Sequence, residues 1–392
     1  RTHAAFYCQQ PERSCRYNIN YYLTMSDWNS CKKILCVRAD NMGDVIMSGP
    51  AMRALKESFG CSITLLTSSM GSLISTCLPF IDHTLVYDLP WVKATDYPDA
   101  PSCMELVATL RAESFDAAVI FTAYSQSPLP AAMLCFLAGI PLRLAWCREN
   151  PYALLTHWMP DKEPYEKIVH QVARDLAMVG SIGAQPMSDR LMLSVSDAAT
   201  DAMKRKLQQA GIDPRHPFLI VHTGVSEARR EYPVEHWPAV VQQLHDQLRL
   251  PVLLTGSRNE SDKATGIREK TAGDIHVVAG LFSVEEFVAL VRQAALVVSV
   301  NTSTVHIAAA VNTPVVVLYA LTNPQHTPWR ATARVLPFSV PEQLRSKNEL
   351  VRYVSEKMHS KEVPLPLPAG IVQAAKELLP TALRIHEDAK KH

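Results

Sequence analysis

The sequence predicts an α/β protein built from two domains. Apolar runs of strand length alternate with segments of helical periodicity from about residue 32 onward, which is typical of parallel sheets with crossover helices. The chain has 392 residues, a length that suits two domains of ~150 to 180 residues better than one. Its composition, 47% hydrophobic and 20% charged, is that of a globular protein. Two domains leave a cleft between them.

The first half of the chain opens with a buried apolar run and an amphipathic segment. Pro50 lies inside the helical stretch and should kink or restart it. Residues 143–161 contain two prolines and are expected to form loop or short helix. The other elements expected here are strands at 33–37, 62–66 and 117–121 and a helix at 44–59.

A second α/β series follows a helix at about 197–210, whose end is marked by Gly211 and Pro214. Ser283 and Glu286 form a capping box that begins a helix running to about residue 294. This half predicts a second Rossmann-like unit with strands at 218–222, 252–255, 275–278, 296–300 and 315–319. The expected division is a leader at 1–31, domains at 32–195 and 196–355, and a tail at 356–392 with a helix at about 371–386.

Charge and cysteine content exclude several classes of protein. The 39 Lys and Arg residues nearly balance the 38 Asp and Glu residues, so no global field favours nucleic acid. The apolar stretches are shorter than the ~18 to 20 residues that span a bilayer. The nine cysteines form no CxxC pair, which indicates reduced thiols in a cytoplasmic protein and neither a disulfide framework nor a zinc site.

The first candidate site runs from Arg38 through Asp40 to Asp44, between the first strand and the first helix. Open α/β folds place ligands at this edge of the sheet. Gly43 permits close backbone approach, and Asp44 lies where the helix dipole favours its ionised form. Asp44 is therefore a candidate proton acceptor. The alternative is that Asp44 only caps the helix.

The second candidate site follows the strand at 296–300 and opens a helix at about 306–311. Small polar residues there let backbone N–H groups approach a diphosphate, and the helix dipole helps to hold its charge. Ordinary helix capping explains the same residues equally simply, and a lone histidine is more often structural than catalytic. The residues of this site are Asn301, Thr302, Ser303, Thr304 and His306.

The third candidate site follows the strand at 218–222. Thr223 and Gly224 precede two adjacent arginines, of which Arg230 could neutralise a leaving diphosphate. A solvated basic turn is the alternative. Gly256 and Glu260 follow the next strand and are placed to meet a ribose, although Gly256 is also ordinary turn chemistry. GxSxG, GxxxxGK[ST], HExxH and GxGxxG patterns do not occur.

Taken together, these segments resemble glycosyltransferase family 9, the heptosyltransferases of lipopolysaccharide inner-core synthesis. The resemblance covers about residues 32–330. It rests on the order of several strings, namely KILCVR at 33–38, MGDVIMSGPAMRAL at 42–55, YPVEHW at 232–237, LLTG at 253–256, VVSVNTSTVHIAAA at 297–310 and TPV at 313–315.

The resemblance implies a GT-B fold, with the acceptor on the first Rossmann-like domain and the nucleotide donor on the second. It also implies that the C-terminal helix crosses back to the first domain. Asp44 matches the family's proposed base, and Arg230 falls where the family usually has a basic phosphate contact. Glu260 matches a ribose contact, and residues 302–306 match the loop that holds the diphosphate and the donor sugar. Where the family usually has Asp-Ser/Thr-Gly, this chain has Asn301, Thr302 and Ser303.

The expected reaction is an inverting transfer without metal or cofactor, with ADP-heptose as the donor implied by the resemblance. Asp44 would take the acceptor proton while Arg230 and the amides near 302–304 stabilise the departing diphosphate. Arg38, Asp40 and Gly43 are expected on the acceptor side. Two alternatives stay open: a nucleotide-sugar epimerase or hydrolase on the same fold, and a non-catalytic protein that binds a nucleotide sugar or a glycan.

A lipid-linked saccharide acceptor would bring the enzyme to the inner face of the inner membrane as a peripheral protein. Arg143, Arg148 and Lys162 are candidate contacts with that surface. No nucleic-acid partner is expected.

Overall fold

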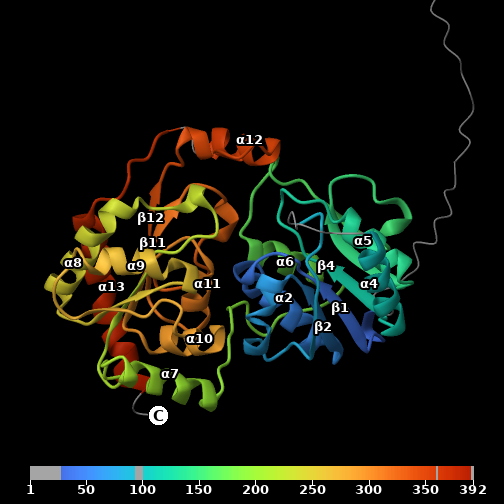
Figure 1. The fold of residues 1–392 in the computed structure, drawn as a ribbon. Coiled ribbons are helices and arrows are strands. Elements are labelled where there is room, and N and C mark those ends of the chain that lie inside the picture. Colours follow the sequence, from blue (N-terminus) through green and yellow to red (C-terminus); the bar gives the residue numbers. More distant parts are fainter. Residues whose placement is uncertain (1–27, 93–99, 359–360, 390–392) are drawn as a thin grey trace, which may run out of the picture.

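The computed structural model describes residues 28–92, 100–358 and 361–389, and it shows two α/β domains that face each other (Figure 1). Most of the expected leader at 1–31 lies outside these residues. The first sheet is parallel and six-stranded, in the order β3-β2-β1-β4-β5-β6. Its strands are β1 (Lys33–Val37), β2 (Ser62–Thr67), β3 (His83–Val86), β4 (Ala117–Ile120), β5 (Leu142–Cys147) and β6 (His157–Pro160).

The second sheet repeats this plan, in the order β12-β11-β10-β7-β8-β9. Each sheet therefore reverses strand order beside its first strand, at β1/β4 and at β7/β10, which is where doubly wound folds bind ligands. The strands are β7 (Leu219–His222), β8 (Val252–Thr255), β9 (Ile275–Val277), β10 (Leu296–Val300), β11 (Val315–Ala320) and β12 (Ala333–Phe338). The strands expected from the sequence in this half are confirmed, with ends that differ by one residue at most.

Helices cover both faces of each sheet. The first domain carries α2 (Met42–Phe59), α3 (Ser69–Ser72), α4 (Ala100–Ala112), α5 (Leu129–Leu137), α6 (Gln171–Gly180) and the short 3-10 helices η1 (Ser75–Cys77) and η2 (Tyr152–Leu154). The second carries α7 (Asp197–Gln209), α8 (Trp237–Leu248), α9 (Ser261–Arg268), α10 (Val284–Gln293), α11 (Ser303–Ala310), α12 (Glu349–Met358), α13 (Pro368–Ala389), η3 (Ala228–Arg230), η4 (Val234–His236), η5 (Arg258–Glu260), η6 (Pro324–His326) and η7 (Glu342–Leu344).

Pro50 does not restart its helix, because α2 is continuous from Met42 to Phe59. The side chains around it are buried between α6 on one side and α11 on the other. Tertiary packing on two sides compensates for the backbone hydrogen bond that a proline removes. At its far end the helix closes at Gly60, whose φ of 59° is left-handed.

The expectation of loop or short helix at 143–161 is wrong. This stretch completes the sheet with β5 and β6, joined by η2. The charged Arg143 concealed the strand pattern, yet its side chain is buried and donates to the carbonyl oxygens of Ile140, Ala153 and Leu154. Arg143 is therefore a structural residue, and its burial removes it as a candidate membrane contact.

The C-terminal helix α13 packs on the second domain, which corrects the expectation that it crosses back to the first. Its contacts are with α8, β10, β11 and β12. Ile371, Val372 and Ala375 are fully or almost fully buried in the core of that domain. The apolar face of α13 is stabilised by packing against an apolar surface, and the second sheet, which directly precedes α13 in the chain, provides that surface.

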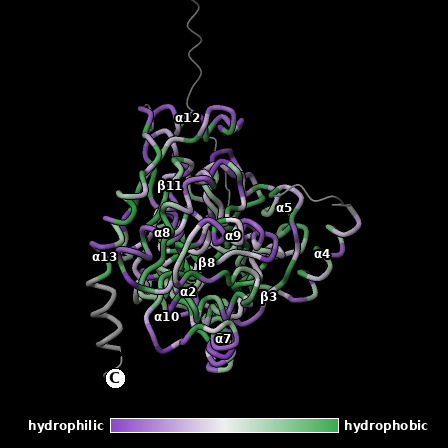
Figure 2. The backbone as a smooth tube through the Cα atoms, turned by 60° about the vertical axis from the view of Figure 1, so that its left-hand side comes forward, coloured by the Kyte–Doolittle hydropathy of each residue, from purple (hydrophilic) through white to green (hydrophobic). Residues whose placement is uncertain are grey.

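Hydropathy along the chain follows this layering. Figure 2 shows the strands of the interior as largely hydrophobic, while the outer helices α7 and α12 contain many hydrophilic residues. Within the described residues, no helix is both long and apolar enough to cross a membrane. The domains meet where α2 packs against α11, so the starts of these two helices face each other across the interface.

Candidate active site

A cavity of about 510 Å³ opens between the two domains, at the carboxyl ends of the strands of both sheets. Its walls come from the loops after β1, β7, β8, β9, β10 and β11, together with residues of α3 and α10. The structure brings eleven of the residues expected from the sequence to this one cavity: Gly43, Asp44, Gly224, Arg230, Gly256, Glu260, Asn301, Thr302, Ser303, Thr304 and His306.

Asp44 is the carboxylate that the first domain presents to the cavity. It occupies the third position of α2 in a capping box with Asn41, so it is not the N-cap residue itself. Its Oδ2 accepts from the backbone N–H of Asn41 at 3.3 Å, and Nη2 of Arg38 donates to Oδ1 at 3.1 Å. The side chain is 17% exposed. Capping and a role at the cavity are therefore compatible in one residue.

Arg38 and Asp40 support Asp44 from beneath and do not line the cavity. Arg38 is fully buried and also lies 3.3 Å from Asp40, measured from Nε to Oδ2. Asp40 accepts from Nε2 of Gln126 at 2.6 Å. Burial raises the pKa of Asp40, and Arg38 opposes that shift. The burial of Arg38 corrects the expectation that it contacts an acceptor directly; it orients the carboxylate that does face the cavity.

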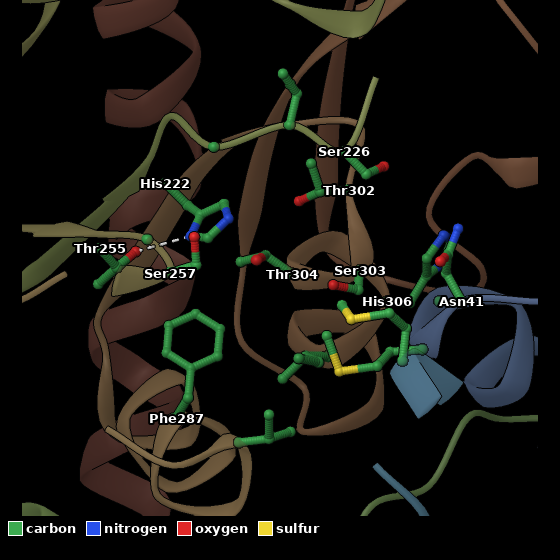
Figure 3. A pocket seen from close by; sticks show the side chains of 18 of the residues that line it. Asn41, His222, Ser226, Thr255, Ser257, Phe287, Thr302, Ser303, Thr304 and His306 are labelled. Carbon is green, nitrogen blue, oxygen red and sulfur yellow. Dashed lines mark hydrogen bonds between the residues drawn. The ribbon is translucent and has the colours of Figure 1, made fainter. Parts of the chain in front are cut away.

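The second domain presents the start of α11 to the same space. Thr302 is the N-cap residue, and its side chain makes no capping hydrogen bond. The first amides of a helix have no partner within it, so Ser303 and Thr304 offer backbone donors at the positive end of the dipole. Figure 3 shows the side chains of residues 302–304 along the middle of the cavity. This arrangement suits a phosphate group.

Asn301 faces the backbone of the neighbouring strand. Its Oδ1 accepts from the N–H of Ala320 at 3.3 Å, and its Nδ2 donates to the carbonyl of Ala320 at 3.4 Å and to Thr322 Oγ1 at 3.3 Å. The residue is 8% exposed. An amide can donate and accept at once, and this position uses both capacities. Asn301 therefore ties the start of the loop to β11.

Glu260 packs against two glycines. A Cβ added to Gly224 would overlap the Glu260 carboxylate, and one added to Gly256 would stand 3.0 Å from Glu260 Cβ. Oε2 of Glu260 accepts from the backbone N–H of Ser257 at 2.6 Å. The absence of side chains at 224 and 256 is what admits the carboxylate to the cavity wall. Thr223, by contrast, is buried and does not line the cavity, although its carbonyl accepts from Lys263 at 3.1 Å.

One end of the cavity is aromatic, and of its two rings His222 ends the strand of the third candidate site, whereas Phe287 was not predicted from the sequence. The rings of His222 and Phe287 lie 5.8 Å apart between centroids, and His222 Nδ1 is 3.0 Å from Thr255 Oγ1 (Figure 3). Burial lowers the pKa of His222 to about 4, so this ring is neutral at pH 7. A flat group such as a nucleobase could stack here. Phe287 gave no signal because it lies on the core-facing side of a capped helix.

Arg230 and His306 lie toward the other end. Arg230 pairs with Glu227 at 2.8 Å, and its Nε is buried with no hydrogen-bond partner among the described residues. His306 is 5% exposed, and its Nδ1 likewise has no partner in the described part of the chain. Burial, and then nearby His326, His170 and Arg230, hold the pKa of His306 well below its ordinary value. Both side chains present nitrogen atoms that a bound ligand would satisfy.

His326 also lines the cavity, although no sequence motif indicated it. Its Nε2 lies 3.7 Å from Asp44 Oδ1, although the two residues belong to different domains. The segment that carries it docks on the first domain: Nε2 of Gln325 donates to Glu163 at 2.6 Å, and His170 Nε2 lies 2.8 Å from the carbonyl of Thr327. Only the docking of the two domains brings these groups together.

A search of residues 28–92, 100–358 and 361–389 finds no group of three or more His, Cys, Asp or Glu side chains arranged to hold a metal ion. The charged side chains that line this cavity are Asp44, Arg230, Arg258 and Glu260.

Comparison with known proteins places the chain in a family. The profile of glycosyltransferase family 9 (heptosyltransferase) matches residues 103–353, more than half of the chain. Lipooligosaccharide heptosyltransferase 2 of Haemophilus influenzae is 26% identical over 313 residues, a match that covers 75% of this chain and 85% of that protein.

Solved structures show the same fold. The glycosyltransferase family 9 protein of Veillonella parvula has a TM-score of 0.73 at 17% identity, covering 89% of this chain and 98% of that one. The ADP-heptose lipopolysaccharide heptosyltransferase II of Escherichia coli has a TM-score of 0.68 at 20% identity, covering 89% and 99%. The expected GT-B architecture of two facing α/β domains is thus confirmed, and the chain is a glycosyltransferase that belongs to family 9, the heptosyltransferase family.

Proposed function

We propose that the chain transfers heptose from ADP-heptose to a hydroxyl of a lipopolysaccharide core saccharide, with inversion at the anomeric carbon. One observation carries the proposal: Asp44 of the first domain and the start of α11 in the second line a single cavity, with Arg230 beside them. A base and a diphosphate cradle on opposite walls are what direct displacement requires. Two relatives support this choice of donor and acceptor, the lipooligosaccharide heptosyltransferase 2 of Haemophilus influenzae and the ADP-heptose lipopolysaccharide heptosyltransferase II of Escherichia coli.

Asp44 acts as the base. The acceptor oxygen forms a bond to the anomeric carbon and gives its proton to Asp44, while the bond from that carbon to the diphosphate oxygen breaks. The electron pair leaves with the diphosphate. Arg38, fully buried behind Asp44, orients the carboxylate through its 3.1 Å hydrogen bond.

Arg230 and the first amides of α11 hold the charge that develops on the diphosphate. Arg230 supplies a cation, and the amides of Ser303 and Thr304 supply oriented dipoles. The aromatic end at His222 and Phe287 takes the adenine, and Glu260 meets the ribose. In this assignment cationic side chains and a helix dipole neutralise the leaving group, and no metal takes part. Addition of EDTA is expected to leave the rate unchanged.

The acceptor domain works at the cytoplasmic face of the inner membrane, where a lipid-linked core saccharide would be presented. Of the candidate basic contacts, Lys162 is exposed, whereas Arg148 is partly buried and donates to the carbonyls of Tyr124 and Glu163. Lys162 alone attracts an anionic membrane surface less strongly than a cluster of basic residues does. We therefore expect the contact with the membrane to be reversible.

A donor panel followed by mass spectrometry tests the proposal. Purified protein is incubated with ADP-heptose, UDP-sugars or GDP-sugars, each with and without a lipid A core acceptor. Transfer of heptose from ADP-heptose to the acceptor is the expected result. Release of free sugar without acceptor would indicate a hydrolase or epimerase, and binding without consumption of donor would indicate a binding protein.

Asp44→Asn tests the base. It keeps the size of the side chain and removes the proton acceptor, so turnover should fall by about 10³-fold or more while donor affinity stays near that of the wild type. Asp201→Asn is the matched control, because Asp201 is an exposed residue of α7. An Asp44→Asn enzyme with the wild-type rate would show that another group takes the proton.

A further inference from the structure

His326 faces the carboxylate of Asp44 from the opposite domain. Its Nε2 lies 3.7 Å from Asp44 Oδ1, whereas the guanidinium of Arg38 lies 3.1 Å from the same oxygen. At 3.7 Å the two groups are not hydrogen-bonded, yet a small rotation of either side chain would bring them into range. Asp44 thus lies between a permanent cation and an imidazole nitrogen.

The neighbouring Asn323 determines which form of the imidazole faces Asp44. Oδ1 of Asn323 accepts from the backbone N–H of Gln325 at 2.9 Å, so its Nδ2 is the atom that lies 3.2 Å from His326 Nε2. An amide nitrogen can only donate. Nε2 is therefore the acceptor and carries the lone pair, and the ring proton is on Nδ1.

The surroundings keep this ring neutral. Burial is the first cause, and the positive charges of Arg230 and Arg38 and the neighbouring His170 add to it, so the pKa of His326 lies well below its ordinary value. His306 packs edge-on against the ring, with centroids 6.5 Å apart. Among the described residues, the acidic partner of His326 is Asp44.

The position of the ring is set by contacts with the first domain on both sides of it in the chain. Gln325 is fully buried, and its Nε2 donates to Glu163 Oε2 at 2.6 Å and to the carbonyl of Val169 at 3.0 Å. On the other side, the carbonyl of Thr327 lies 2.8 Å from His170 Nε2. Two such anchors leave the imidazole between them little freedom to turn away from Asp44.

We propose that His326 is a positioning residue for the base: its neutral Nε2 accepts a hydrogen bond from Asp44 once Asp44 has taken the proton of the acceptor. The inference rests on the proposed function. The proton stays on the Asp44 oxygen and is shared with the Nε2 lone pair, and the Asn323 contact lengthens as it forms. Because this hydrogen bond exists only with the protonated carboxyl, it favours transfer of the acceptor proton to Asp44.

Replacement of His326 by alanine removes the acceptor. The expected result is a fall in kcat of about tenfold, the value of one lost hydrogen bond, with the KM for the donor unchanged. The acid limb of the kcat profile should also move to lower pH, because Asp44 loses a partner that favours its protonated form. His326→Gln offers a carbonyl oxygen as acceptor and should restore part of the rate and part of the shift. His245→Gln, on α8 of the second domain, is the control and should behave as the wild type.

Three kinetic outcomes would overturn the proposal. An unchanged kcat in His326→Ala would show that the ring does not act on Asp44. A lower kcat with an unmoved acid limb, or no gain in His326→Gln, would leave His326 a purely structural role.

Histidine ¹⁵N spectra give a readout that does not depend on turnover. The signals of His326 are those that the wild-type spectrum contains and the His326→Gln spectrum lacks. At pH 7 these signals should report a neutral ring protonated on Nδ1, and an imidazolium would contradict the proposal. If no sugar donor is consumed by the wild type, the proposed function fails, while these spectra still decide the state of His326.

Discussion

Gly43 of the first domain and His306 of the second lie in direct contact where the two helix starts face each other. A Cβ added to Gly43 would stand 3.0 Å from His306 Cδ2 and 3.5 Å from the Cα of Ser303. The distance between the carboxylate wall and the phosphate-binding wall of the cavity is therefore set at a position that has no side chain. Asp44 follows directly, so any separation here moves the base away from the donor.

Gly43→Ala should lower kcat by about tenfold, since misplacement of reacting groups by a fraction of an ångström is costly. The midpoint of thermal unfolding should change little, because alanine is the better helix former. Steady-state kinetics and a melting curve check both points. Gly266→Ala in α9, where nothing lies within 4 Å of the added Cβ, is the control and should keep full activity. Equal rates in the two variants would show that the domains separate more easily than this contact indicates.

Gly224→Ala should weaken donor binding. The new methyl group would occupy the space of the Glu260 carboxylate, which must then leave the cavity wall. We expect the KM for the donor to rise by about tenfold or more, with a smaller effect on kcat, as when a contact made equally in ground and transition states is lost. Titration calorimetry with ADP checks the loss directly. Glu260→Gln, which keeps the shape of the side chain, should be milder, and a normal affinity in Gly224→Ala would contradict the packing described.

Asn301→Asp should destabilise the protein, although it brings in the residue that the family usually has there. The carboxylate can still accept from Ala320 N–H, but it cannot donate to the Ala320 carbonyl and would be repelled by it. We expect the free energy of unfolding to fall by about 1–3 kcal/mol in urea at pH 7. Asn348→Asp is the matched control, because the Asn348 side chain only accepts, from Leu350 and Val351. A fully stable Asn301→Asp would show that the loop rearranges.

Asp175 should make stability depend on pH. Burial raises its pKa from 3.8 to about 6 despite Arg38 and the hydrogen bond from Ser48. The folded protein then binds more protons than the unfolded chain between these values, so this residue's contribution to stability is full below pH 3.8 and is lost as the pH rises to about 6. The slope is at most about 1.4 kcal/mol per pH unit.

Asp175→Asn should abolish that contribution. His222, whose pKa is lowered to about 4, acts in the opposite direction, because its contribution is lost as the pH falls below its ordinary pKa. The measurement is therefore the difference in unfolding free energy between variant and wild type, in urea at pH 4.5 and at pH 6.5. The variant should gain on the wild type as the pH rises. A constant difference would mean that Asp175 does not titrate in this range.

Elements whose local pattern agrees with their final environment could be predicted from the sequence. The strands Lys33–Val37 and Leu296–Val300 have the bounds expected from their apolar runs, and α10 begins at the capping box of Ser283. β5 was not predicted because Arg143 interrupts its apolar pattern. The Arg143 guanidinium can be buried there only because nearby carbonyl oxygens accept its hydrogen bonds. The docking of α13 on the second domain is likewise a matter of tertiary packing.

The sequence by itself determined that the loops after β1, β7, β8 and β10 form part of the site, since each follows a buried strand, and the carboxyl ends of parallel strands collect at one edge of a sheet. It therefore located Asp44, Arg230 and the 301–306 loop without reference to any contact. Only the tertiary structure decided that Asn301 binds β11 within the second domain and how the two domains fit, so that Gly43 meets His306 and His326 faces Asp44. The contact of Gly43 with His306 and that of Asp44 with His326 join residues hundreds of positions apart, and their geometry depends on how two whole domains pack, which no local pattern encodes.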